Sequence, residues 1–426
     1  MSFNTEITAG PLDAQQPKEA SFLFVCVSSL LLLAINVRIF GTGWAVFMVA
    51  LCVWILYQGR KGLFYLLQRR PILVLLPLLF ATSCLWSDER FISLSLGTQT
   101  LLSALTAVTI AYRASQRQLL LILFLSIGMG CLGSLAYGQK GASAEGLVLI
   151  GFLGSKDAMG LFAYAGVMAS VAVLWDRGQK KFVRWAAFFM ALVELYIAST
   201  VHAMTSVFCV IAGLMGFLAI LYILARSKIT RWIIYCLMAF AIVITASFNT
   251  EITDFLTSTL FPSLGKDATL TGRTVLWDKA INLFLDAPVL GHGFRAYWVG
   301  SSTDAHTMLY RMGVSDGRGF HFHEQYLETL ADTGIIGFMI LLTTFAVFVK
   351  RIADRVTAQP TPFTAYSLTV VVIYIARWFF ETAFLPFSFD MMLFYMLGAS
   401  AVIHALPARS DPPKNYIYTP DVSRAV

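Results

Sequence analysis

Charged residues are scarce in this sequence. Asp, Glu, Lys and Arg make up 13% of the 426 residues, about half the share of roughly 25% found in soluble domains. The hydrophobic share is 58%, which is more apolar surface than the core of a soluble enzyme can hold. Disordered, collagen-like and coiled-coil proteins are excluded by the same figures. The composition therefore predicts a polytopic α-helical membrane protein.

Cysteine is also scarce, and its positions exclude two kinds of site. Each of the six cysteines falls inside an apolar run. We therefore expect neither a disulfide framework nor a thiolate metal site. The net charge of +7 would suit a nucleic-acid-binding protein, but the basic residues form short clusters between apolar runs, as in the cytoplasmic loops of membrane proteins. Nucleic acid is therefore not an expected partner.

Twelve apolar runs are long enough to cross a bilayer core, which takes about 20 helical residues. Their approximate limits are residues 22–37, 43–59, 71–86, 94–112, 118–137, 157–175, 183–200, 205–225, 231–248, 333–349, 363–384 and 388–406. The short loops on one side and the two tails carry most of the lysines and arginines, so the positive-inside rule places both termini in the cytoplasm. The first 20 residues are polar and lack a basic segment, which predicts no cleaved signal peptide.

One long segment interrupts the alternation of spans and short loops. Residues 249–332 are predicted to form an external loop, and they carry four of the six histidines. Loops of this length are usually functional or disordered, and the aromatic residues and apolar spacing here favour a folded loop that carries the chemistry. The expected order is a cytoplasmic tail (1–20), nine membrane helices (21–248), the catalytic loop (249–332), three membrane helices (333–406) and a second cytoplasmic tail (407–426).

Two stretches of this loop present an arginine. Residues 272–285 have the apolar spacing of an amphipathic helix at the membrane surface. Arg273 stands at its N-terminal end, where the helix dipole favours an anion; contact with lipid head groups is the alternative. Gly291 and Gly293 permit a tight turn that presents Arg295. The formal match of this turn to a dinucleotide fingerprint is rejected, because no strand precedes it and no βαβ unit is available.

A third stretch, residues 319–334, runs directly into the tenth span. Its His323-Glu324 pair is not a zinc-protease motif, because position 327 is Leu. A zinc site at His321 and His323 would need another histidine of the loop, and no spacing enforces it. A helical register places His321 on a polar stripe and His323 beside Tyr326, where partial burial suits a general base. A packed interfacial histidine is the alternative.

Charges inside the predicted spans are costly and therefore informative. Arg377 and Glu381 lie four residues apart on one helical face and can form a pair, although Arg377 is equally suited to a substrate phosphate. Glu194 lies near His202 and Thr205 at the external end of its span. These residues fit either the rim of a cavity or polar packing between helices.

Taken in this order on this topology, the motifs resemble those of the O-antigen ligase and Wzy-type polymerase superfamily of bacterial envelopes. The residues that carry the resemblance are Leu85-Trp86-Ser87, the segment Gly-Ser-Lys-Asp-Ala-Met-Gly at 154–160, Arg-x-x-Leu-Trp at 273–277, Pro-x-x-Gly-x-Gly-Phe at 288–294 and His-x-x-Tyr-Leu…Gly-x-x-Gly at 323–337. Within the superfamily, the exopolysaccharide polymerases of the ExoQ type look most similar. The chain departs from the family at Glu324 and Asp157, where the family usually has Asn.

The resemblance implies a GT-C-like helical protein of the bacterial inner membrane that needs no cofactor or metal. It implies transfer of a glycan from undecaprenyl pyrophosphate to a sugar hydroxyl on the external face. The implied partners are this donor, the acceptor, membrane lipid and, as an open alternative, a chain-length regulator. His323 is expected to be the base. The residues expected to bind pyrophosphate or substrate are Arg273, Arg295, Arg377 and Lys156, and supporting residues are Trp277, His321, Tyr326, Glu324 and His202.

Other interpretations stay open. Polymerase and ligase use the same donor, so the sequence does not separate them. A metal-dependent GT-C glycosyltransferase would use a carboxylate pair such as Asp88-Glu89, for which a solvated helix cap is the alternative. A twelve-span transporter or flippase would show related halves and polar residues at mid-membrane. No repeat is visible in this sequence, and its intramembrane charges are few, which favours the enzyme.

Overall fold

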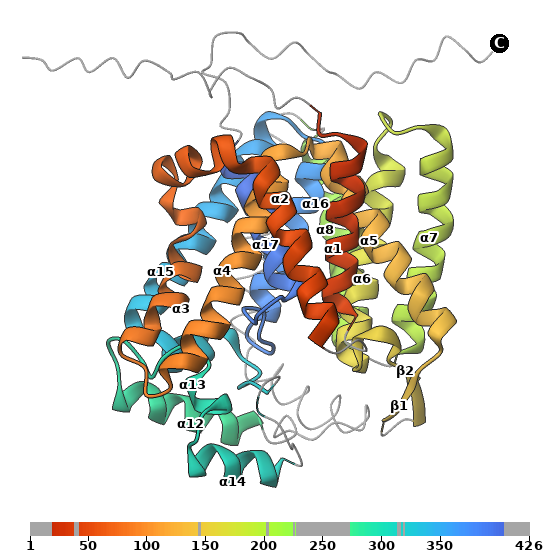
Figure 1. The fold of residues 1–426 in the computed structure, drawn as a ribbon. Coiled ribbons are helices and arrows are strands. Elements are labelled where there is room, and N and C mark those ends of the chain that lie inside the picture. Colours follow the sequence, from red (N-terminus) through yellow and green to blue (C-terminus); the bar gives the residue numbers. More distant parts are fainter. Residues whose placement is uncertain are drawn as a thin grey trace, which may run out of the picture.

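The computed structural model describes residues 19–37, 42–143, 146–201, 204–224, 226, 273–312, 317 and 320–403. Within these residues, long helices form a bundle, and three short helices lie together beyond one end of it (Figure 1). Six of the described helices are long and apolar enough to cross a membrane. The chain is therefore an all-α multi-pass membrane protein, as its composition predicted. The count of twelve spans stays a prediction, and the ninth run, 231–248, lies outside the described residues.

The bundle and the short helices account for nearly all regular structure in the described residues. The bundle helices are α1 (Phe22–Asn36), α2 (Thr42–Arg69), α3 (Leu75–Thr82), α4 (Arg90–Arg113), α5 (Gln116–Tyr137), α6 (Lys156–Trp175), α7 (Lys181–Thr200), α8 (Met204–Leu224), α15 (Gln325–Ala358), α16 (Pro362–Arg377) and α17 (Phe389–Ile403). The short helices are α12 (Arg273–Asp286), α13 (Ala296–Val299) and α14 (Thr303–Arg311). Three 3-10 turns lie at Pro71–Leu73, Ser83–Leu85 and Gly151–Leu153. A small antiparallel hairpin, β1 (Lys140–Ser143) with β2 (Gly146–Leu149), follows α5.

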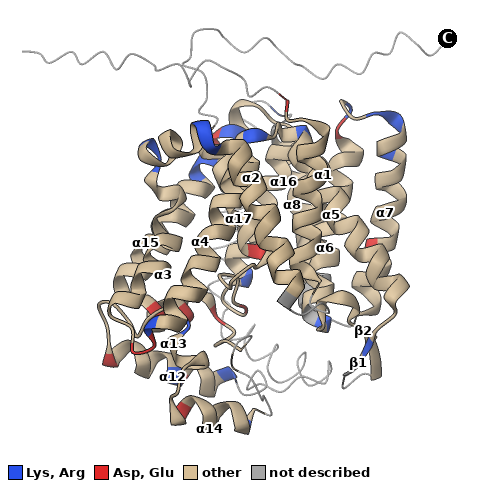
Figure 2. Cartoon of the chain, viewed as in Figure 1, with Lys and Arg blue, Asp and Glu red and all other residues tan. Residues whose placement is uncertain are grey.

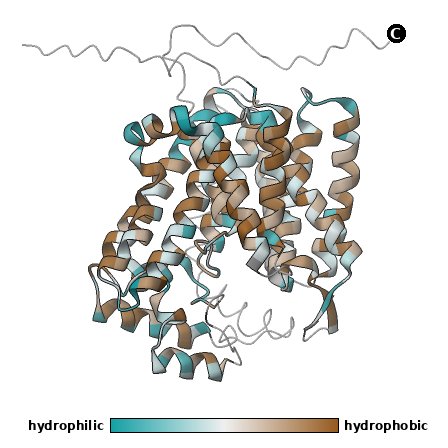
Figure 3. Ribbon diagram, in the orientation of Figure 1, coloured by the Kyte–Doolittle hydropathy of each residue, from teal (hydrophilic) through white to brown (hydrophobic). Residues whose placement is uncertain are grey.

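Charge is distributed unevenly along the bundle. Figure 2 shows that most of the lysines and arginines of the bundle gather at the end opposite α12–α14. Hydrophobic residues cover the length of the helices between two more hydrophilic ends (Figure 3). By the positive-inside rule the basic end is expected to be cytoplasmic, and this orientation stays a prediction.

Several helix boundaries differ from the apolar runs. The second run was expected to end at 59, but α2 continues to Arg69 through a mixed amphipathic segment. The third run is divided into a 3-10 turn, α3 and a second 3-10 turn. The eleventh run was expected to extend to 384, whereas α16 ends at Arg377. The helix ends there because Gln325 of α15 forms hydrogen bonds with the backbone of the residues that follow. The backbone N–H of Gln325 donates to the carbonyl of Trp378, and its side-chain oxygen accepts from the N–H of Ala383.

A break in α15 joins the bundle to the short helices. Gly334 has φ +60°, and a Cβ there would lie 2.4 Å from the carbonyl carbon of Val289. This contact excludes any residue with a side chain at position 334 without a shift of the backbone. The N–H of Ile335 donates to the carbonyl of Pro288, and the N–H of Gly293 to that of Asp332. The Pro-x-x-Gly-x-Gly-Phe motif is therefore a docking element on α15.

The short helices share a core of their own. Its buried apolar residues are Leu276, Ala280, Leu283, Tyr297, Trp298, Ala305, Leu309, Phe322 and Ala331. We call α12–α14 with the adjoining residues 287–295 and 320–324 the loop unit. Ala331 belongs to α15, so this core is continuous with the bundle. Over the residues that the structure describes, this part of the chain folds against the helices, and its place as an external loop stays a prediction.

Candidate functional site

Two histidines and a glutamate meet where the loop unit contacts the bundle. The Nε2 atom of His321 lies 3.3 Å from Oε1 of Glu381, and Nδ1 of His323 lies 3.6 Å from the same oxygen. The centroids of the two imidazole rings are 4.2 Å apart. We call these three residues the His–Glu cluster. The sequence identified both histidines but placed Glu381 in a helix, so the cluster itself was not predicted.

Three connections hold the segment that carries Glu381. The side-chain oxygen of Gln325 accepts from the N–H groups of Ala383 (2.8 Å) and Phe384 (2.9 Å). A guanidinium N–H of Arg273, the first residue of α12, donates to the carbonyl of Phe380 at 3.0 Å. Residues 378–388, which we call the turn segment, are thus tied to both α15 and the loop unit. These ties bring Glu381 to the histidines.

Side-chain hydrogen bonds also hold the backbone just before α15. Glu324 is the N-cap of α15, and its carboxylate accepts from the N–H of Leu327, which satisfies a backbone donor at the helix start. His323 has φ +55°, a left-handed conformation that is uncommon for residues other than glycine. The indole N–H of Trp277 donates to the carbonyl of Phe322 at 3.2 Å. The helical register expected for His321 and His323 is therefore wrong: both precede the helix.

Burial and charge set the protonation of the cluster. Burial lowers the pKa of His321 to about 3. The charge of Glu381 raises this pKa, whereas the charges of His323, Arg295 and Arg273 lower it further. Burial alone would raise the pKa of Glu381, but its contacts with the two histidines and the charge of Arg377 bring it down to about 2. Near neutral pH, His321 is therefore neutral and Glu381 is a carboxylate.

The pKa of Glu324 moves in the opposite direction. Burial raises it to about 7, although N–H groups of Leu327 and Tyr326 stabilise the charged form. The carboxylate of Glu328 adds to the increase. Part of the Glu324 population is therefore protonated at neutral pH, although the side chain caps a helix.

These shifts predict how stability depends on pH. Between about pH 3 and pH 6.5 the unfolded chain binds more protons at His321 than the folded chain, so this residue makes the fold less stable as pH falls. Glu324 has the opposite effect between about pH 4.5 and pH 7, where the folded chain holds the extra proton. In detergent, His321→Asn should therefore unfold with less acid sensitivity than wild type, and Glu324→Gln with more. Parallel curves for wild type and His321→Asn would show that His321 titrates equally in both states.

Arg295 has a different position from the one the motif suggested. Its side chain is fully buried, and Nη1 donates to Oε1 of Glu328 at 2.7 Å. Nη2 donates to the carbonyl of Phe320. The second oxygen of Glu328 accepts from the N–H of Phe322 at 2.7 Å. Arg295 thus holds the chain just before the His–Glu cluster, and its expected role toward pyrophosphate stays a prediction.

Arg377 does not pair with Glu381 as the sequence suggested. Because α16 ends at Arg377, the i,i+4 relation is lost, and Arg377 donates to Asp390 of α17 at 2.7 Å. Its Nε and Nη1 atoms are buried without a hydrogen-bond partner among the described residues. A buried guanidinium with unused N–H groups is a candidate anion ligand. Its charge also acts on Glu381.

The remaining predicted residues are placed as follows. Tyr326 lies in the first turn of α15, and its hydroxyl donates to the carbonyl of Ile375 at 2.9 Å. Lys156 is the first residue of α6 and partly buried; its role toward substrate stays a prediction. His202 lies outside the described residues. Glu194 accepts from the hydroxyl of Ser170 at 2.7 Å, which supports polar packing between α6 and α7.

The carboxylate pair of the metal-dependent alternative is also engaged. Glu89 accepts from the N–H and hydroxyl of Ser301 at 2.7 Å and 2.6 Å. Asp88 faces His292, with 3.7 Å between Oδ2 and Nδ1. Glu89 therefore ties the α3–α4 turn to the segment between α13 and α14, which argues for a structural role of this acid.

The His–Glu cluster has the donor types of a zinc site, with its three candidate ligand atoms within 4.8 Å of one another. The hydrogen bonds of the cluster fit proton transfer better than they fit zinc binding. The N–H of His323 donates to Nδ1 of His321 at 3.1 Å, so the neutral ring carries its proton on Nε2. That proton points at Glu381, in the space that a cation would need. The arrangement therefore fits a proton-transfer site rather than a zinc site.

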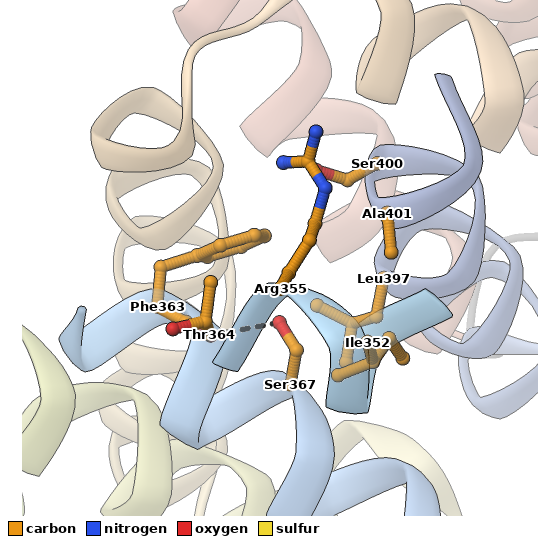
Figure 4. A pocket seen from close by; sticks show the side chains of 8 residues that line it. All are labelled: Ile352, Arg355, Phe363, Thr364, Ser367, Leu397, Ser400 and Ala401. Carbon is orange, nitrogen blue, oxygen red and sulfur yellow. Dashed lines mark hydrogen bonds between the residues drawn. The ribbon is translucent and has the colours of Figure 1, made fainter. Parts of the chain in front are cut away.

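An apolar groove is lined in part by Tyr326 and Phe379, which lie close in sequence to His323 and Glu381. Its volume is about 500 Å³. The residues that line it belong to α15, α16 and the turn segment, and they are Tyr326, Phe338, Leu342, Phe345, Ala346, Val349, Ile375 and Phe379. We call it the lateral groove. Figure 4 shows a second pocket around Arg355, but its volume of about 10 Å³ holds no more than about one water molecule.

Comparison with known proteins agrees with the resemblance noted in the motifs. A curated relative, the "Exopolysaccharide production protein ExoQ" of Rhizobium meliloti (strain 1021), is 27% identical over 212 residues. The matched region covers 48% of this chain and 48% of that protein, so the chain spans about half the length of the relative it matches. Residues 197–342, which include α12–α14 and the start of α15, match the family described as "O-Antigen ligase". The predicted resemblance is confirmed, and the stretch similar to the family includes the short helices and the start of α15.

Proposed function

We propose that the chain is a glycosyltransferase that joins lipid-linked repeat units into an exopolysaccharide or O-antigen on the external face of the bacterial inner membrane. The observation that carries the proposal is the His–Glu cluster, whose residues lie close in sequence to Tyr326 and Phe379 of the lateral groove. A base, an arginine and an apolar channel meet there, and a donor with a sugar, a pyrophosphate and a lipid tail needs all three.

The reaction that fits this arrangement is inverting and needs no metal. A hydroxyl oxygen of the acceptor sugar attacks the anomeric carbon of the donor glycan. The bond between that carbon and the pyrophosphate oxygen breaks, and the electron pair leaves with undecaprenyl pyrophosphate. Nε2 of His323 takes the hydroxyl proton. The imidazolium then returns its proton to solvent or to the released pyrophosphate, which restores the base.

The leaving group gains negative charge, and two arginines are suited to stabilise it. Arg273 lies next to the turn segment and is partly exposed, with one N–H engaged by Phe380. Arg377 has two buried nitrogen atoms without partners among the described residues. We assign pyrophosphate binding to these two residues and a structural role to Arg295.

The lateral groove suits the tail of the donor. Its lining includes Tyr326 and Phe379, which lie close in sequence to His323 and Glu381. Because α15 breaks at Gly334, the ring of Tyr326 lies 6.1 Å from that of Phe345, and the continuous part of the lining, from Phe338 to Val349, is roughly 17 Å of helix. The isoprene units next to the pyrophosphate would lie here and leave the pyrophosphate at the cluster.

The second candidate is a ligase that transfers the glycan to a different acceptor. The family description favours it, whereas the name of the curated relative favours exopolysaccharide production. Because both reactions use one donor, the acceptor decides between them.

Reconstitution tests the proposal. Purified protein in liposomes, given undecaprenyl-pyrophosphate-linked repeat units of its host and EDTA, is expected to give a ladder of lengthening lipid-linked chains. Single transfer that requires lipid A-core would identify a ligase. Activity that is lost with EDTA and restored by a divalent cation would contradict the metal-independent mechanism. No product with either acceptor, from protein shown to be folded, would overturn the proposal in favour of a transporter.

A further inference from the structure

We propose that Glu381 and His321 are positioning residues that hold His323 in the tautomer able to act as a base. The inference rests on the proposed function, since it concerns how the base is prepared. It starts from the hydrogen bonds of the cluster and assigns a task to a glutamate that lies outside the region matched by the family.

His321 fixes one side of the arrangement. Its Nδ1 accepts the backbone N–H of His323 at 3.1 Å, so the proton of the neutral ring must be on Nε2. Nε2 lies 3.3 Å from Oε1 of Glu381, within reach of a hydrogen bond. The side chain of His321 is only 12% exposed. His321 therefore acts as a neutral donor that orients the carboxylate.

Glu381 faces the other ring with the same oxygen. Nδ1 of His323 is buried and has no hydrogen-bond partner among the residues that the structure describes, and buried polar atoms seldom remain unsatisfied. Oε1 of Glu381 is 3.6 Å away, and a small rotation of its side chain brings it to hydrogen-bond distance. A carboxylate only accepts hydrogen bonds. It therefore favours the tautomer of His323 that has the proton on Nδ1 and a lone pair on Nε2.

The Nε2 lone pair is the one that the reaction requires. The side chain of His323 is 31% exposed, more than either of its partners in the cluster. Its left-handed backbone, held between the N-cap of α15 and the carbonyl bonded by Trp277, limits other orientations. A histidine oriented by a carboxylate at its other ring nitrogen is a recurrent arrangement for general bases.

Glu381→Gln tests the inference because it keeps the size of the side chain and allows the amide to donate instead of accept. With the reconstituted protein, kcat should fall about 10²-fold with little change in KM. The acid limb of the pH–rate profile should move to lower pH, since the carboxylate that stabilises the imidazolium is gone. The other charges near the cluster, Arg273, Arg295, Glu328 and Arg377, are the same in both proteins. Glu381→Asp should recover part of the rate.

A second readout does not depend on activity. In ¹⁵N-histidine-labelled protein, the signals of His323 can be assigned by their loss in His323→Ala. Wild type should show the tautomer with the proton on Nδ1, and Glu381→Gln should shift it toward Nε2. If Glu381→Gln fails to fold, Glu381→Asp and His321→Asn take its place, and each should change the tautomer population and lower kcat. Asp286→Asn, at an exposed end of α12, is the matched control.

The outcomes separate the two proposals. Wild-type kcat and an unchanged tautomer in Glu381→Gln, with His323→Ala inactive, would overturn the positioning role and leave the proposed function intact. Full activity of His323→Ala would overturn the assignment of the base itself. A fall in kcat with no change of pH profile or tautomer would reduce Glu381 to a structural role and also refute the inference.

Discussion

Replacing His323 with alanine is expected to lower the rate of glycan transfer by about 10² to 10⁴-fold, the usual contribution of a general base. The acceptor hydroxyl then has no group to take its proton, while the donor still binds through Arg273, Arg377 and the lateral groove. The expected signature is a fall in kcat with little change in donor KM, measured with the reconstituted enzyme and a fixed donor preparation.

A matched histidine is available as a control. His306 is exposed on α14, in the same part of the chain but outside the His–Glu cluster, so His306→Ala should leave the rate unchanged. Equal losses in both variants would indicate damage to the loop unit instead of loss of the base. A fully active His323→Ala would contradict the proposed mechanism.

Replacing Arg295 with alanine is expected to destabilise the loop unit by about 3–5 kcal/mol, the usual effect of leaving one member of a buried ion pair alone. Glu328 would keep its carboxylate inside the fold with only the N–H of Phe322 as partner. Chemical unfolding in detergent and the rate of proteolysis within the loop unit should both report the change.

Two further variants separate structure from substrate binding. The double substitution Arg295→Met with Glu328→Leu should recover much of the stability, because apolar residues of similar size often replace a buried pair without loss. Arg311→Ala, at an exposed end of α14, is the control and should unfold like wild type. If Arg295→Ala kept its stability but lost donor binding, the result would favour the role that the sequence suggested for Arg295, which is binding of the donor pyrophosphate.

Local patterns of the sequence were a good guide where the structure is local. The apolar spacing after Gly272 predicted a helix up to Leu285, and α12 runs from Arg273 to Asp286. The low charge content predicted a multi-pass membrane protein. The spacing of apolar residues decides the first case, because a surface helix must bury one face. Composition decides the second, because helices surrounded by lipid carry few charges.

Long-range contacts explain what the sequence could not provide. Arg377 and Glu381 have the spacing of a helical pair. However, Gln325, which is far away in sequence, forms hydrogen bonds with the backbone of Trp378 and Ala383, and α16 ends at Arg377. Glu381 thereby becomes a partner of the histidines. Arg295 follows glycines that suggest exposure, yet its guanidinium forms an ion pair with the buried Glu328. No local pattern reports which distant group will satisfy a backbone amide or a buried charge.

The tie between Arg273 and Phe380 has a consequence for the newly made protein. It joins residues 107 positions apart, and at about 5–20 residues per second the ribosome needs roughly 5–20 s to cover that stretch. The loop unit is completed during this interval, whereas Glu381, which contacts its two histidines, is made only at the end of it. Until then, the two histidines lack the carboxylate that we propose to orient the base.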